Sequence, residues 1–131
     1  LQNLINQKKL EKQILLLGFK KNIFQYLKDA KAFILPSLWE DPGFVILESA
    51  FMNIPIISSD CPNGPREILD YGKAGFLFCN NDNNDFKKNL SAFLNTNDSD
   101  LLKKKIAAKK QTREYSIFNH AKNFRKIINN L

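Results

Sequence analysis

Cysteine, glycine, proline and long apolar runs are all scarce in this 131-residue sequence. Its two cysteines, Cys61 and Cys79, are too few for a disulfide framework or a four-cysteine zinc site, so we expect both to be reduced in the cytoplasm. Five glycines and five prolines exclude a collagen-like or Pro/Gly-rich disordered chain. No apolar run approaches the roughly 18–20 residues of a membrane-spanning helix, and residues 1–13 do not resemble a signal peptide. The composition predicts one folded domain, with 44% hydrophobic and 25% charged residues.

Positive charge is concentrated near the end of the chain. Residues 1–99 hold 11 Lys/Arg and 11 Asp/Glu, whereas residues 100–131 hold nine Lys/Arg and two acids, which together give the net charge of +7. A solvated helix face and an attraction to an anionic membrane surface both explain this segment. It lacks the interleaved aromatic residues and binding motifs of a nucleic-acid-binding stretch, so we expect no nucleic-acid partner.

Short apolar runs alternate with helical patterns along the chain. Strands are expected at residues 14–17, 32–35, 54–57 and 76–78, and helices after residue 22 and at 43–53, 65–69, 85–94, 100–112 and 117–131. Strands that are apolar on both faces and separated by helices indicate a parallel sheet with helices on each side. The sequence therefore predicts a Rossmann-like α/β fold, which binds ligands at the carboxyl ends of its strands.

The loop after the second expected strand has the features of a phosphate site. Asp41 suits a helix N-cap and Pro42 the first helical position. Gly43 lets a ligand approach the backbone closely. The free amides near Gly43, Phe44 and Val45 would offer donors and a partial positive charge to a phosphate.

Two carboxylates flank this helix start. Glu48 lies in a helix that is otherwise almost entirely apolar, so it needs a partner. Glu40 precedes it by eight residues, which is about 12 Å along a helix axis, too far for a glycoside-hydrolase pair at about 5–9.5 Å. The spacing suits two contacts on a long ligand such as a nucleotide-diphosphate sugar. A solvated Glu40 and a lysine-paired Glu48 are the structural alternatives.

On these residues the chain resembles the retaining glycosyltransferases of family 4, which have the GT-B fold. Glu40 through Glu48 matches their E-x7-E motif, and further blocks follow the family's order at residues 18–19, 35–37, 43–50, 55–60, 63–69 and 75–77. The resemblance covers roughly residues 1–94, and the final helices match more loosely. It implies that residues 1–131 are a single partial domain, the C-terminal donor-binding half of a GT-B enzyme, with residues 95–131 as a helical extension.

The resemblance also implies roles for individual residues. Glu40 would be the catalytic-site residue near the donor sugar, and Glu48 would bind the ribose hydroxyls. The backbone at 43–45 would contact the diphosphate and sugar, and residues 18–20 would lie beside the base. The implied donor-binding set is Gly18, Phe19, Lys20, Ser37, Gly43, Phe44, Val45 and Glu48.

The implied reaction moves a sugar from a nucleotide diphosphate to an acceptor hydroxyl with retention, in cell-envelope polysaccharide synthesis. The nucleotide-diphosphate sugar is a co-substrate, and neither a cofactor nor a metal is expected. The partners would be a saccharide or lipid-linked acceptor and the enzyme's own N-terminal domain. That domain and the family's cationic Gly-Arg and Lys segment are absent from this sequence, so we expect the fragment alone to be inactive. Peripheral contact with the inner face of the plasma membrane would fit the basic end.

Other interpretations compete with this one. A non-catalytic α/β module that binds a phosphate ligand or a protein has the same local features, as does an epimerase or phosphorylase of the same overall fold. Asp98 and Asp100 are explained by helix capping rather than metal binding. Arg66 and Glu67 fit the family pattern, with a local ion pair as the structural alternative. Trp39 would either stack on a sugar or close the loop against the core.

Overall fold

A three-stranded parallel sheet forms the centre of the protein. The computed structural model describes residues 1–130. Its strands are β1 (Phe33–Leu35), β2 (Ile56–Ser59) and β3 (Phe76–Phe78), in the order β1-β2-β3. Phe33 lies opposite Ile56 in the first pair, and Ile57 lies opposite Phe76 in the second. All four residues of β2 are buried, as expected for a central strand that is covered on both faces.

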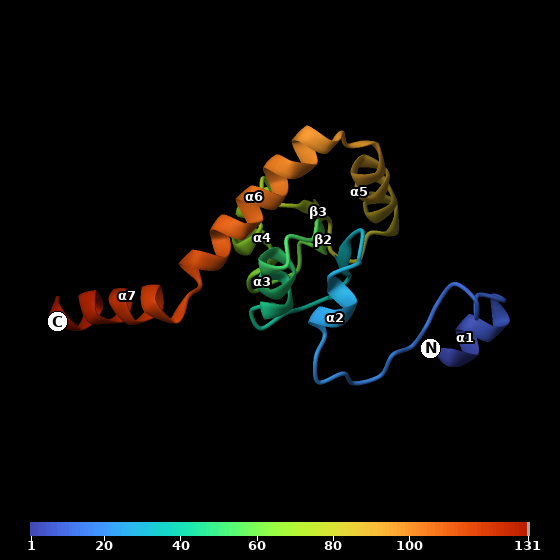
Figure 1. Ribbon diagram of the computed structural model, residues 1–131, viewed down its shortest axis with the longest axis horizontal. Coiled ribbons are helices and arrows are strands. Elements are labelled where there is room, and N and C mark those ends of the chain that lie inside the picture. The colour runs from blue at the N-terminus through green and yellow to red at the C-terminus, as the bar shows by residue number, and fades with distance from the viewer. Residues whose placement is uncertain (131) are drawn as a thin grey trace.

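Helices surround this sheet and continue beyond it (Figure 1). They are α1 (Gln2–Gln7), α2 (Phe24–Leu27), α3 (Phe44–Phe51), α4 (Pro65–Ile68), the 3-10 turn η1 (Asp70–Gly72), α5 (Asn83–Asn95), α6 (Asp98–Glu114) and α7 (Ile117–Asn129). The long helix α6 runs along the body of the molecule, whereas α7 points away from it. The predicted α/β class, with a parallel sheet flanked by helices, is confirmed.

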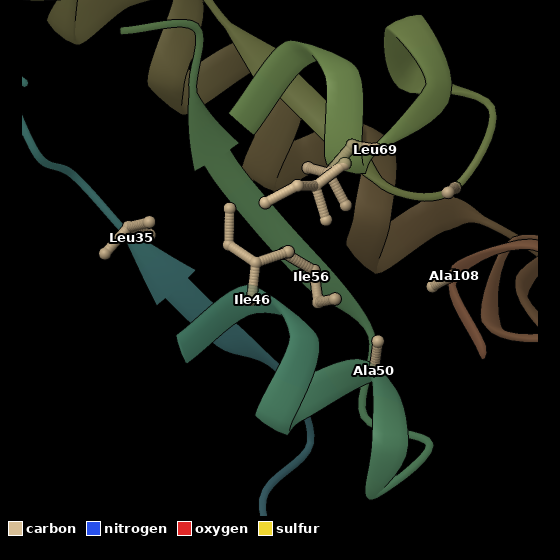
Figure 2. Packing of buried hydrophobic residues seen from close by; sticks show 8 residues of the cluster. Leu35, Ile46, Ala50, Ile56, Leu69 and Ala108 are labelled. Carbon is tan, nitrogen blue, oxygen red and sulfur yellow. The ribbon is translucent and has the colours of Figure 1, made fainter. Parts of the chain in front are cut away.

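The hydrophobic core has two parts, one on each face of the sheet. Between the sheet and helices α3 and α6, Ile46 and Ile56 lie close to Leu69, and Ala50 faces Ala108 of α6 (Figure 2). On the other face, helix α5 covers β3 through edge-to-face aromatic contacts, Phe76 with Phe93 and Phe78 with Phe86. The result is a three-layer arrangement that fixes the carboxyl ends of the strands.

Polar side chains fix the later helices. The Asn97 side chain caps α6 by accepting a hydrogen bond from the Asp100 amide at 2.9 Å, and the acidic first turn contains Asp98 and Asp100. The expected acidic first turn is therefore confirmed, whereas the N-cap is Asn97 and not one of the two aspartates. Farther along α6, the Lys104 amine donates to the carbonyls of Gly72 and Gly75 at 2.7 and 2.9 Å. Partial burial lowers the pKa of Lys104, and its two hydrogen bonds attach α6 to the loop before β3.

The strand expected at residues 14–17 is absent, and this prediction is wrong. The four side chains are between 40% and 78% exposed, and β1 is left as an edge strand of the sheet. The Ile14 amide donates to the Leu10 carbonyl at 2.9 Å, so a turn leads into this run. Ile14 and Leu16 line a groove with residues of α1 instead of pairing with β1. Local contacts with α1 therefore replace the expected strand pairing.

Candidate functional site

Two loops at the carboxyl edge of the sheet pack tightly against each other. The Ser59 hydroxyl at the end of β2 donates to the Ser37 carbonyl at 2.5 Å, and the Glu40 amide donates to the Pro62 carbonyl at 3.3 Å. A Cβ atom built on Gly64 would lie only 2.0 Å from the Pro42 carbonyl oxygen. Residues 37–43 and 60–64 therefore form one continuous wall, and the first of these loops leads directly into α3.

The start of α3 differs from the expected one. Gly43 occupies the N-cap position in the left-handed conformation, with φ of 84°, and no side chain caps the helix. Asp41, which the sequence favoured as the N-cap, lies two residues earlier and is exposed. The Ile46 amide makes the first helical bond, to the Gly43 carbonyl at 2.9 Å, so the amides of Phe44 and Val45 precede that bond. The expected amide donors therefore occur at this helix start, directly after Gly43.

Glu40 lies directly beside this helix start. Its side chain is partly buried, and its Cγ and Oε2 atoms lie 3.5 and 3.6 Å from the position that a Cβ on Gly43 would occupy. A Cβ atom at residue 43 would thus be in ordinary van der Waals contact with the Glu40 side chain. The left-handed φ of Gly43, rather than a lack of space, favours glycine at this position.

Glu48 lies farther along α3 and lines a cleft that does not include Glu40. This cleft, of about 240 Å³, lies between α2, α3 and the end of α6 and is lined by Phe24, Leu47, Glu48, Phe51, Thr112 and Tyr115. Within residues 1–130 the carboxylate of Glu48 forms neither an ion pair nor a side-chain hydrogen bond, so the lysine-paired alternative is not the one adopted. Glu40 and Glu48 therefore lie at opposite ends of residues 40–48, the segment that contains the start of α3.

The loop at residues 18–20 is not brought to this edge of the sheet. Gly18, Phe19 and Lys20 are exposed, Phe19 by 93%, in a stretch that runs outside the helices and strands (Figure 1). Because the preceding strand does not form, nothing anchors this loop beside the other candidate residues. Its proposed position beside a nucleotide base stays a prediction.

Arg66 forms an ion pair after β2 with a partner that the sequence did not indicate. Arg66 pairs with Asp60, its Nε donating to both carboxylate oxygens at 2.8 and 3.0 Å. The hydrogen bond that Arg66 donates to Asp60 and the negative charge of that carboxylate raise the pKa of Arg66. The pairing expected for Arg66 was local and involved Glu67, so the partner differs. The adjoining cleft, of about 410 Å³, is also lined by Tyr71.

The loop after β3 has its own anchor. The Cys79 amide donates to the Asp85 carboxylate at 2.7 Å, and this bond lowers the pKa of Asp85. The Asn80 side chain reaches the Leu38 carbonyl at 2.9 Å, which links this loop to the one that carries Glu40. Within residues 1–130, no group of three or more His, Cys, Asp or Glu side chains is arranged to hold a metal ion.

Comparison with protein families identifies the chain. The family model described as "Glycosyl transferases group 1" matches residues 1–114. The chain belongs to this family. The resemblance found in the sequence is thus confirmed at the level of the group 1 glycosyltransferases.

Curated group 1 relatives extend well beyond this chain. An uncharacterized glycosyltransferase of Methanocaldococcus jannaschii is 46% identical over 69 residues, which is 53% of this chain and 17% of that protein. The N-acetylgalactosamine-N,N'-diacetylbacillosaminyl-diphospho-undecaprenol 4-alpha-N-acetylgalactosaminyltransferase of Campylobacter jejuni is 29% identical over 84% of this chain and 29% of its own length. The UDP-Gal:alpha-D-GlcNAc-diphosphoundecaprenol alpha-1,3-galactosyltransferase of Escherichia coli is 39% identical over 59% of this chain and 20% of its own. The chain spans less than a third of each.

Solved structures show the same fold. An S. aureus TarM variant, in complex with UDP, fondaparinux and alpha-GlcNAc-glycerol, superposes with a TM-score of 0.80 at 23% identity, over 98% of this chain and 26% of that one. A glycosyltransferase from Rickettsia africae gives a TM-score of 0.81 at 20% identity, over 99% and 36%. The group 1 chain thus has the α/β fold found in part of these GT-B glycosyltransferases.

Proposed function

We propose that this group 1 domain binds the nucleotide-sugar donor of a retaining glycosyltransferase of the family 4 type. The full enzyme would move the sugar from a nucleotide diphosphate to an acceptor hydroxyl with retention of configuration. The observation that carries this proposal is the start of α3, where the amides of Phe44 and Val45 precede the first helical hydrogen bond and Glu40 lies beside Gly43. Membership of the glycosyltransferase family supports the same function.

Different residues at and near the start of α3 would bind different parts of the nucleotide-sugar donor. The amides of Phe44 and Val45 would hold the diphosphate, where the partial positive charge of a helix start favours an anion. Glu48 would accept hydrogen bonds from the ribose hydroxyls, and Glu40 would face the transferred sugar. Ser37, whose carbonyl accepts a hydrogen bond from the Ser59 hydroxyl, would support the loop that carries Glu40. Electrostatic stabilisation of the departing diphosphate is the main catalytic demand, and we expect the reaction to need no metal or cofactor.

Residues 1–131 would act as a single partial domain, with residues 95–131 as its helical extension. The acceptor-binding domain and the cationic residues that neutralise the diphosphate would come from elsewhere in the enzyme. We therefore expect the isolated chain to bind a nucleotide weakly and to transfer no sugar. Its acceptor would be a saccharide or a lipid-linked saccharide, as the names of the Campylobacter jejuni and Escherichia coli relatives indicate for those enzymes.

Replacing Glu48 with alanine should weaken nucleotide binding about tenfold or more, because a hydrogen bond to a charged group contributes about 1.5–3 kcal/mol. Calorimetric titration of the isolated chain with UDP, GDP and ADP measures the loss and identifies the base. Glu11→Ala is the matched control, since Glu11 is an exposed carboxylate outside the site. Equal affinities for the wild type and Glu48→Ala would disprove the ribose contact.

Helix α7 would supply peripheral contact with the inner face of the plasma membrane. No helix within residues 1–130 is both long and apolar enough to cross a membrane. However, α7 exposes large apolar side chains and carries cations among them. The apolar side chains are Ile117, Phe118, Phe124, Ile127 and Ile128, and the cations are Lys122, Arg125 and Lys126. An anionic lipid surface matches this combination.

Vesicle binding tests this contact. Replacing Lys122 and Arg125 with glutamine should lower binding to vesicles rich in phosphatidylglycerol about 30-fold, because each cation near such a surface contributes about 1 kcal/mol. Cosedimentation with vesicles of graded anionic content measures the effect. The control is a Lys8 and Lys12 double glutamine variant, which removes the same charge near α1. Binding that ignores the anionic lipid content would rule the contact out.

A further inference from the structure

A groove that the proposed mechanism does not use lies between the end of α3 and the second half of α6. Its volume is about 390 Å³, within the range of about 300–1,000 Å³ that is usual for small-molecule sites. It is lined by Phe51, Ile106, Lys109, Lys110, Thr112 and Arg113. We infer that this groove binds the phosphate headgroup of an anionic phospholipid. The inference goes beyond donor binding, and it concerns a different surface from the membrane contact proposed for α7.

The packing of α3 against α6 places the groove. Ala50 of α3 faces Ala108 of α6 (Figure 2), so the two helices meet next to Phe51. The lining residues at 106, 109, 110 and 113 are spaced i, i+3, i+4 and i+7, and they therefore share one face of α6. The Lys109 amine lies 5.9 Å from the centroid of the Phe51 ring. Cations of α6 and an aromatic ring of α3 therefore line the same groove.

The cations of the groove have no anionic partner. Within residues 1–130, the charged groups of Lys109, Lys110 and Arg113 form neither an ion pair nor a hydrogen bond. Earlier in α6, by contrast, Lys103 has an acidic partner and Lys104 has two carbonyl partners. Like charges three and four residues apart repel each other on a helix, and the helix dipole favours a cation only in the last turn, where Arg113 lies. An anion bound in the groove would offset this repulsion.

The other lining groups indicate which anion fits. Phe51 and Ile106 are 63% and 47% exposed, and a free phosphate would leave both in contact with water. The Thr112 hydroxyl already donates to the Lys109 carbonyl at 2.8 Å. Among residues 1–130, those that line the groove include no carboxylate or amide side chain, so a neutral sugar would find few partners. A phospholipid carries its phosphate next to glycerol and acyl carbons, which match the cations and the apolar side chains together.

The groove lies at the end of the molecule from which α7 extends. Helix α7 begins at Ile117, after a two-residue connection from the end of α6 (Figure 1). An enzyme held on a membrane by α7 would therefore have this groove close to the lipid surface. Phe51 and Thr112 also line the cleft that contains Glu48, so a headgroup in the groove would lie beside the proposed ribose contact.

Backbone amide NMR of the 131-residue chain with a soluble short-chain phospholipid tests the site. Dihexanoyl-phosphatidylglycerol, kept below its critical micelle concentration, should shift the amide signals of residues 51 and 106–113, and dihexanoyl-phosphatidylcholine should shift them much less. Replacing Lys109 and Arg113 with glutamine should weaken binding of the anionic lipid about 30-fold. Replacing Lys87 and Lys88 with glutamine removes the same charge from exposed positions on α5 and should leave the binding unchanged.

Inorganic phosphate distinguishes a lipid headgroup from a free anion. Phosphate should shift the same residues only at higher concentrations, and Phe51→Ala should weaken lipid binding about fivefold without changing phosphate binding. The inference would be overturned by phosphate that binds as tightly as the anionic lipid, by equal affinities for the two lipids, or by lipid-induced shifts confined to α7.

UDP separates this inference from the proposed function. The Lys109 and Arg113 double variant should bind UDP as the wild type does. Weaker UDP binding by that variant would show that these cations serve the nucleotide, and it would overturn the lipid site. A wild-type chain whose residues 43–48 do not respond to UDP would count against the donor site alone, because the lipid titration does not involve those residues.

Discussion

Replacing Glu40 with glutamine should lower the turnover number about 100-fold, the scale of removing one well-placed electrostatic group, while donor affinity changes less. Glutamine preserves the shape of the side chain against Gly43 but removes its negative charge. If Glu40 faces the transferred sugar, that charge is most valuable when the bond to the diphosphate breaks and positive charge develops on the sugar ring. Steady-state kinetics of the enzyme that joins this domain to its acceptor-binding domain measure kcat and KM separately.

The neighbouring carboxylate provides the control for this experiment. Asp41→Asn makes the same chemical change one residue along the loop, at an exposed side chain, and should leave both constants nearly unchanged. A Glu40→Gln enzyme with normal kcat and a raised KM would mean that the carboxylate stabilises bound substrate and transition state equally. That result, or an unchanged enzyme, would remove Glu40 from the chemistry.

Strand β3 and helix α3 could be predicted from the sequence because their signals are local and agree with their surroundings, whereas β2 lies at Ile56–Ser59, two residues later than the expected strand at 54–57. Phe76–Phe78 is a short apolar run that is bounded by turn residues on both sides, and the structure has a strand with the same bounds. Helix α3 is almost entirely apolar, and it packs between the sheet and α6. In each case the buried environment that the residues require is supplied by elements on both sides.

Residues 14–17 show where such signals fail. Four consecutive apolar residues predict burial, but they do not specify the surface that buries them. Here α1 offers Ile14 and Leu16 a nearby apolar surface, and the run joins that surface instead of the edge of β1. The expected position of Gly18–Lys20 at the edge of the sheet depended on this strand, and without the strand their place beside a nucleotide base stays a prediction.

Only part of the candidate site could be predicted from the sequence. The sequence shows the spacing of Glu40 and Glu48 and the glycine between them. The structure places all three residues on one segment. The pairing of Arg66 with Asp60 could not be predicted from the sequence, because Glu67 and Asp60 are equally suitable partners for Arg66. The turn at Asn63 and Gly64 decides which of the two carboxylates the Arg66 side chain reaches. The exposed ring of Tyr71 also has no sequence signal, since its left-handed backbone is set by the surrounding fold.

Replacing Gly64 with alanine should destabilise the protein by about 3 kcal/mol or more, which combines the penalties of overpacking and of a strained backbone. The new Cβ would lie 2.0 Å from the Pro42 carbonyl oxygen, and the φ of 117° at Gly64 is itself unfavourable for alanine. Backbone cannot move aside as a flexible side chain can, so the loops at residues 37–43 and 60–64 would have to separate. Urea unfolding followed by circular dichroism measures the change in the free energy of unfolding.

Gly72→Ala separates the two causes of this effect. Gly72 also has a positive φ, of 90°, but a Cβ there would meet nothing within 4 Å, so only the conformational penalty of about 1–3 kcal/mol should remain. Equal losses for the two variants would show that the contact between the loops contributes little. A much larger loss for Gly64→Ala, with weaker UDP binding by the fraction that stays folded, would show that the wall at residues 60–64 holds Glu40 and the start of α3 in place.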